Sequence, residues 1–209
     1  SSDINLLNKA NKFDLLIVSG WRGNSDPDNR DGSIETMKAM YKMDRLLAKI
    51  ILEKKYNYSI ALRSKAGGTH WNMKDWGNEE DYYKKIYGEN TVFHYFDHEE
   101  GQVRMPIYNL MLKSNLSITV LSTAVFEAFG YGKKILLCNF TGGNEFHCWD
   151  DLIVTNNDTL KGLSDVIDDL LCDNIDHEKY MTYSKYIMNY PDKILVEDFI
   201  KDQIIKILG

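Results

Sequence analysis

Cysteine is scarce in this sequence, and the few that occur are not spaced as a disulfide or zinc framework. The chain of 209 residues holds three, Cys138, Cys148 and Cys172, which is an odd number with no CxxC pair. Disulfide-rich secreted domains and zinc knuckles use paired cysteines at short spacings. We therefore expect these residues to be reduced thiols in a cytoplasmic protein.

Long apolar runs and an excess of positive charge are also missing. No stretch reaches the roughly 18 to 20 apolar residues that a membrane-spanning helix needs, and the first residues, SSDINLLNKANKF, are polar rather than signal-like. Asp and Glu outnumber Lys and Arg by 31 to 25, so the chain lacks the field that would neutralise a nucleic-acid backbone. The composition predicts no transmembrane segment and disfavours general nucleic-acid binding.

The sequence does contain enough apolar material for one sizeable core. Hydrophobic residues make up 44% of the chain, and its length suits one large domain. We find no internal repeat, no low-complexity tract and no obvious linker. A single domain over residues 1–209 is the expected organisation.

Short apolar runs alternate with amphipathic helical patterns along the chain. This alternation is typical of right-handed βαβ crossovers, and it predicts a Rossmann-like α/β fold, a doubly wound parallel sheet of about six strands with helices on both faces. The predicted strands are 13–20, 58–65, 90–96, 116–122, 133–140 and 151–156, and the predicted helices are 33–55, 79–88, 105–115, 123–131, 157–173, 176–190 and 194–208.

Ligands of such sheets bind beyond the carboxyl ends of the strands. The loops that begin after Gly20, Leu62, Phe96, Leu121 and Asn139 are therefore where we expect the chemistry of this protein to gather.

The stretch SITVLSTAVFEAFGYGKK, residues 117–134, is the most informative of these regions. If a helix begins at Ser122 or Thr123, its free N–H groups and the two hydroxyls suit a phosphate, although a serine is also an ordinary helix N-cap. Glu127 follows about one turn later. A carboxylate there either accepts the two hydroxyls of a ribose or lies solvated on the outer face of the helix. The residues alone do not decide whether Ser122 and Thr123 bind a phosphate or only cap the helix, nor whether Glu127 binds a ribose or lies in solvent.

A strand followed by STAVFEAFGYGKKILLCN resembles the C-terminal, nucleotide-sugar-binding domain of GT-B glycosyltransferases, of the kind used in bacterial surface-carbohydrate assembly. In that family a Ser/Thr pair opens a helix, an acidic residue follows, and a glycine step leads to the next strand. The likeness covers most of the chain. It implies that Ser122 and Thr123 bind the phosphates of the donor and that Glu127 binds its ribose.

The same resemblance implies roles for residues near the first two strands. Arg63 and Lys65, at the end of the second predicted strand, would face the donor diphosphate, and Gly20, Trp21 and Arg22 would lie at the cleft between two domains. Related transferases often carry Arg-Pro-His-Pro after this strand. The chain has RSKAGG instead, so the assignment of a basic residue that faces the donor diphosphate rests mainly on Arg63.

The resemblance implies metal-independent transfer of a sugar from a nucleotide-activated donor to a glycan or polyol acceptor, with the nucleotide sugar as substrate and no cofactor. A complete enzyme of this type has an N-terminal acceptor domain of comparable size, for which 209 residues leave no room. We therefore expect a domain excised from a two-domain protein. A nucleotide-sugar 2-epimerase, which shares this architecture, and a non-catalytic α/β interaction module are the alternatives.

Histidines supply secondary candidates for a general base. His70 in GGTHW and His147 in GNEFHCWDD lie on glycine-containing loops at predicted strand ends, where a base could reach a substrate. The spacing of His147, Cys148 and Asp150 matches no tetrahedral zinc pattern. We therefore predict no metal site.

Overall fold

The computed structural model describes residues 13–20, 33–62, 79–95, 106–120, 122–130, 132–141, 153–173, 176 and 178–180. Within these residues six parallel strands form one sheet in the order β3-β2-β1-β4-β5-β6. The strands are β1 (Phe13–Val18), β2 (Tyr58–Leu62), β3 (Phe93–Tyr95), β4 (Ser114–Thr119), β5 (Ile135–Cys138) and β6 (Val154–Thr155). This is the strand order of a doubly wound Rossmann-like sheet, and it confirms the predicted fold class.

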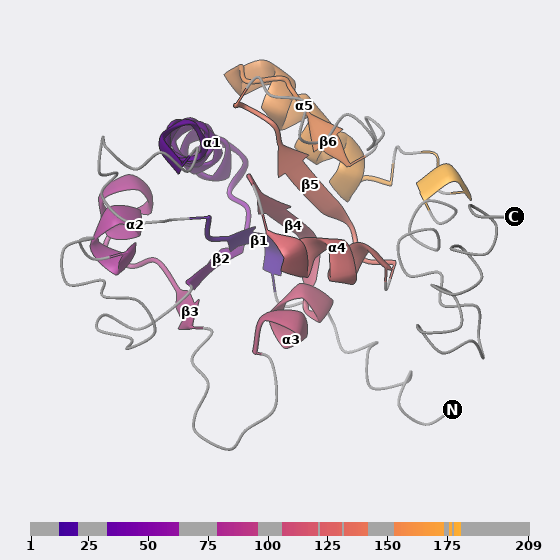
Figure 1. Ribbon diagram of the computed structural model, residues 1–209, viewed down its shortest axis with the longest axis horizontal. Coiled ribbons are helices and arrows are strands. Elements are labelled where there is room, and N and C mark those ends of the chain that lie inside the picture. Colours follow the sequence, from indigo (N-terminus) through magenta and orange to yellow (C-terminus); the bar gives the residue numbers. More distant parts are fainter. Residues whose placement is uncertain are drawn as a thin grey trace, which may run out of the picture.

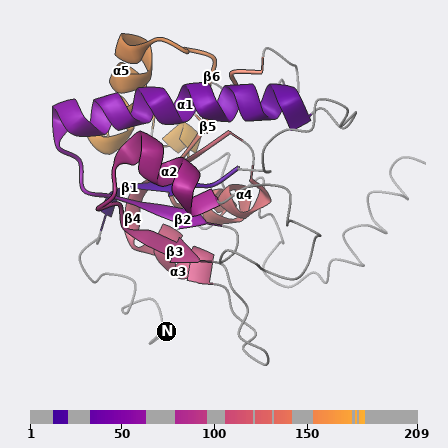
Figure 2. The same ribbon diagram turned by 90° about the vertical axis from the view of Figure 1, so that its left-hand side faces the viewer.

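Helices cover both faces of the sheet (Figure 1). On one side lie α1 (Ser33–Lys54), α2 (Glu79–Tyr87) and α5 (Leu160–Leu171), and on the other lie α3 (Pro106–Leu112) and α4 (Thr123–Gly130). The long α1 helix lies lengthwise over its face, as Figure 2 shows. In the described part of the chain, no helix is long and apolar enough to cross a membrane.

The side chains of β1 show why both faces must be covered. Leu15 and Ile17 pack in a cluster with α1, α2 and α5, whereas Leu16 and Val18 pack in a second cluster with α3 and α4. All four side chains are fully buried. A strand buried on both faces has a continuous apolar sequence rather than an alternating one, which is the pattern of FDLLIV.

The elements agree with the predicted ones except in their bounds. The fourth strand begins at Ser114 rather than at residue 116 and ends at Thr119 rather than at residue 122. Residues 114 and 115 were predicted to end the preceding helix, which in the structure ends at Leu112. The buried hydroxyl of Ser114 donates to the carbonyl of Met111 at 3.0 Å. Residues 178–180 are helical. Residue 176 is described and is not helical, whereas the remaining residues of the two C-terminal predicted helices lie outside the described residues, as do residues 21–32 and 63–78.

A glycine ends α4 and turns the chain into β5. Gly132 has a φ of 74°, a conformation that favours glycine, and its N–H donates to the carbonyl of Phe129 at 2.8 Å. The N–H of Lys133 donates to the carbonyl of Ala128 at 3.0 Å, which completes a Schellman motif. Gly132 is therefore the C-capping residue of α4.

Thr159 caps the first turn of α5, and its removal has a predictable cost. Its hydroxyl oxygen accepts a hydrogen bond from the N–H of Gly162 at 3.2 Å. Thr159→Ala is expected to lower the free energy of unfolding by about 1 kcal/mol, because the N–H group loses its partner, whereas Thr159→Ser should keep most of the stability. Urea denaturation of the three proteins measures this. Equal midpoints for Thr159→Ala and the wild type would contradict the capping role.

Candidate functional site

The chain diverges to opposite faces of the sheet at the carboxyl ends of the neighbouring strands β1 and β4. β1 pairs with β2 on one side and with β4 on the other. The chain leaves β1 toward α1 on one face of the sheet and leaves β4 toward α4 on the opposite face. Such a point of divergence is where ligands of open α/β sheets bind. Gly20 follows β1 and Ser122 follows β4, so both lie at this edge.

A buried serine and a buried glutamate meet at the end of β1. The hydroxyl of Ser19 donates to the Oε1 atom of Glu79, the first residue of α2. Ser19 also continues the sheet, because its N–H donates to the carbonyl of Ala61 at 3.0 Å. A carboxylate in the first turn of a helix is stabilised by the free N–H groups there. No local pattern in the sequence predicts this pair, since 60 residues separate the two partners.

Ser122 stands at the N-cap of α4. Its carbonyl accepts a hydrogen bond from the N–H of Val125 at 3.3 Å, and Thr123 is the first helical residue. Val125 and Phe129 form the buried face of this helix. Residues 123 and 127 are one turn apart in this helix. The N-terminus of α4, with the position of Glu127 one turn above it, therefore lies at the carboxyl edge of the sheet.

Uncharged polar groups continue this edge beyond β5 and β6. The Nδ2 atom of Asn139 donates to Oδ1 of Asn156 at 2.8 Å, and the hydroxyl of Thr141 donates to Oδ1 of Asn139 at 3.0 Å. The N–H of Asn139 donates to the carbonyl of Thr155 at 2.9 Å. These hydrogen bonds join the ends of β5 and β6 and place polar side chains along the same edge of the sheet.

The structure brings four of the predicted residues to one edge of the sheet. Gly20 follows β1, and Ser122, Thr123 and Glu127 belong to the start of α4 or precede it directly. Arg63 is the next residue after β2, the neighbour of β1, but it is not among the described residues. The other predicted site residues outside the described part of the chain are Lys65, Trp21, Arg22, His70 and His147.

The described cysteines do not form a reactive centre. Cys138 and Cys172 form no disulfide, whereas Cys148 lies outside the described residues. Burial raises the pKa of the Cys138 thiol, which therefore stays protonated and unreactive. Among the residues that the structure describes, no group of three His, Cys, Asp or Glu side chains is placed to hold a metal ion.

No protein-family model matches this chain, and no curated protein does. Among solved structures, a putative UDP-N-acetylglucosamine 2-epimerase from Listeria monocytogenes is similar, with a TM-score of 0.49 and 17% identity over 87% of this chain and 42% of that one. The glycotransferase of kitacinnamycin has a TM-score of 0.28 and 10% identity over 87% of this chain and 44% of that one. This chain thus spans less than half the length of either protein. Likenesses at these scores carry no argument about function, and the fold assignment rests on the strand order itself.

Proposed function

We propose that this chain is the donor-binding domain of a GT-B-type glycosyltransferase, which transfers a sugar from a nucleotide-activated donor to a glycan or polyol acceptor. One observation carries the proposal. The N-terminus of α4, capped at Ser122, lies at the carboxyl end of β4, beside the end of β1, where the connections after the two strands go to opposite faces of the sheet. We also propose that this domain is joined to an acceptor-binding domain and that the enzyme acts in bacterial surface-carbohydrate assembly.

The start of α4 suits the diphosphate of a nucleotide sugar. The free N–H groups and the partial positive charge of a helix N-terminus bind phosphate oxygens without a metal ion. They would also stabilise the negative charge that develops on the diphosphate as the sugar leaves. The Ser122 hydroxyl adds a donor, and Gly20, which has no side chain, leaves room for the phosphate beside β1.

Two further residues complete the proposed donor site. Glu127, one turn into α4, would accept both hydroxyls of the ribose. Arg63, next to the end of β2, would contact the diphosphate with two parallel N–H groups, a geometry that lysine cannot reproduce. The Ser19 and Glu79 pair holds the start of α2 against the end of β1.

Calorimetry of the whole chain with UDP, CDP, GDP and CMP tests the proposal. We expect one of these nucleotides to bind. Glu127→Ala and Arg63→Ala should each weaken binding by roughly tenfold to a hundredfold, because hydrogen bonds to charged groups contribute about 1.5 to 3 kcal/mol. Circular dichroism of each variant shows whether the fold is retained.

Two matched variants remove the same charges far from the proposed site. Glu53 lies near the C-terminus of α1, and Lys85 lies on the exposed face of α2. Glu53→Ala and Lys85→Ala should both keep the nucleotide affinity of the wild type. Absence of binding by the folded wild type at millimolar nucleotide would overturn the proposal and leave a non-catalytic α/β module. If a nucleotide binds, product analysis with the acceptor domain present separates sugar transfer from 2-epimerisation.

A further inference from the structure

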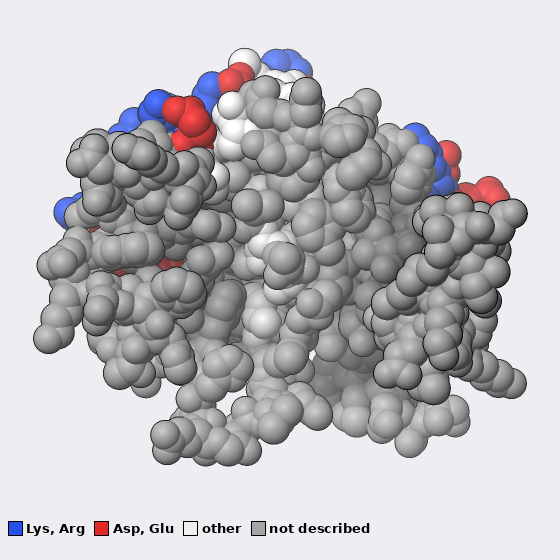
Figure 3. All heavy atoms as spheres, in the orientation of Figure 1, with Lys and Arg blue, Asp and Glu red and all other residues white. Residues whose placement is uncertain are grey.

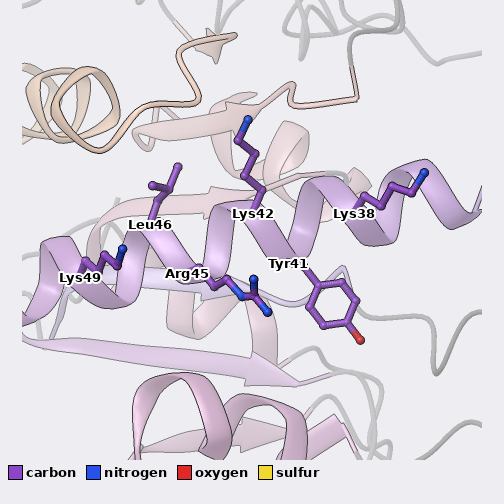
Figure 4. Close-up of a pocket in the computed structure, with 6 residues that line it drawn as sticks. All are labelled: Lys38, Tyr41, Lys42, Arg45, Leu46 and Lys49. Carbon is purple, nitrogen blue, oxygen red and sulfur yellow. The ribbon is translucent and has the colours of Figure 1, made fainter.

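A row of basic side chains runs along the side of α1 that faces away from the sheet (Figure 4). They line a shallow groove of about 520 Å³. The lining residues are Lys38, Tyr41, Lys42, Arg45, Leu46 and Lys49. Figure 3 shows Lys and Arg side chains emerging at the upper left of that view, with acidic side chains among them.

The spacing of these residues makes one continuous stripe. Steps of four, three, four and three residues join Lys38, Lys42, Arg45, Lys49 and Leu52, and all five side chains are exposed. Residues three and four apart are neighbours on a helix surface, and a rise of about 1.5 Å per residue gives the stripe a length of about 21 Å. We call these five residues the α1 ridge.

The ridge is locally positive in a chain whose net charge is −6. Lys38 is paired with Glu35 at 2.7 Å, and Lys42 is paired with Asp158. Neither Arg45 nor Lys49 has a carboxylate within 4.0 Å in the part of the chain that the structure describes. Exposed ion pairs are weak, so Lys38 and Lys42 can exchange their partners for phosphates.

Leu52 distinguishes the ridge from an ordinary solvated helix face. Its side chain is 80% exposed, one turn beyond Lys49 and in line with the basic residues. Tyr41 and Leu46 are half-buried, flank the stripe on opposite sides and pack against the core beneath α1. A soluble polyanion would be attracted by the cations but would leave Leu52 in water. A lipid surface has phosphates for the cations and acyl chains for the leucine.

We propose that the α1 ridge docks the protein on an anionic membrane surface. Arg45 and Lys49, with the other basic residues of the ridge, lie at the level of the lipid phosphates, and Leu52 enters the outer acyl region. The acidic remainder of the chain does not prevent this contact. Charges separated by more than about 8 to 10 Å are largely screened at physiological salt, so the membrane responds to the ridge rather than to the net charge.

Sedimentation of the whole chain with lipid vesicles tests the proposal. We expect binding to phosphatidylcholine vesicles that contain roughly one third phosphatidylserine, little binding to pure phosphatidylcholine, and weaker binding at high salt. The double variant Arg45→Gln/Lys49→Gln should bind about 25-fold more weakly, because each basic residue contributes about fivefold. Glutamine is a good helix former, so α1 is retained. Leu52→Ser should weaken binding at constant charge.

The double variant Lys85→Gln/Lys113→Gln is the matched control, because it changes the net charge equally at exposed positions outside the ridge. It should bind like the wild type. The proposal is overturned if the wild type does not bind anionic vesicles, if neutral vesicles bind equally well, or if the control loses as much binding as the ridge variant. Tighter binding to an oligonucleotide or to polyglutamate than to vesicles would also overturn the proposal, because it would show that the ridge binds a soluble polyanion rather than a membrane. None of these readouts depends on nucleotide binding.

Discussion

The stability of the wild type is expected to fall between about pH 4 and pH 7, and Asp44→Asn is expected to remove this fall. Asp44 lies in the middle of α1 and is 0% exposed. It accepts hydrogen bonds from the hydroxyls of Tyr82 and Tyr87 on α2, each at 2.8 Å. Burial raises the pKa of its carboxyl to about 7, although the two hydrogen bonds act in the opposite direction.

The direction of the pH effect follows from the two states of Asp44. In the unfolded chain its pKa is near 3.8, and in the folded protein it is about 7. Between these values the folded state keeps the proton that the unfolded state has released, so stability falls as the pH rises and the loss is complete above about pH 7. A difference of about three pKa units corresponds to about 4 kcal/mol.

Urea denaturation at a series of pH values measures this effect. The asparagine variant cannot ionise at this position and can still form hydrogen bonds with both tyrosines, so it should be the more stable protein at pH 8 and should lack the slope below pH 7. Asp169→Asn, at an exposed position on α5, should keep the slope of the wild type. The same slope in Asp44→Asn and the wild type would show that Asp44 does not cause it.

Phe129→Ala is expected to destabilise the protein by about 3 to 5 kcal/mol and to abolish the proposed nucleotide binding. Phe129 is 0% exposed, and its ring meets that of Tyr180 edge to face with centroids 4.8 Å apart. The hydroxyl of Tyr180 donates to the carbonyl of Lys133 at 2.8 Å and accepts from the N–H of Ile135 at 2.9 Å. Loss of the ring thus loosens both α4 and the start of β5.

Phe93→Ala is the matched control for this prediction. Phe93 is a half-buried residue on β3, at the far end of the sheet from β6, and it packs on the opposite face from α4. Its removal should cost less stability and leave nucleotide affinity unchanged. Denaturation midpoints and calorimetry measure both effects. A folded Phe129→Ala protein with the nucleotide affinity of the wild type would show that α4 does not depend on this anchor.

Local patterns were sufficient for the types of the elements and for part of the candidate site. The continuous apolar run of β1 and the helical spacing of α1 each reflect the burial of one short segment, which its own residues specify. The start of α4 was predicted for the same reason, because Ser122 and Thr123 are residues that begin helices. The α/β class and the position of a helix N-terminus after β4 can therefore be predicted from local sequence patterns.

Contacts between distant segments were decided only by the tertiary structure. Asp44 is 38 and 43 residues from its partners Tyr82 and Tyr87, and Ser19 is 60 residues from Glu79. No periodicity connects such pairs, since periodicity reports which side of a segment is buried and not what covers it. The order of the strands is undetermined for the same reason, because the apolar strands are interchangeable as patterns. The residue patterns therefore specify the helices and strands and the class of fold, whereas only the packing of the sheet makes β1 and β4 neighbours and brings Gly20 and Ser122 to the same edge.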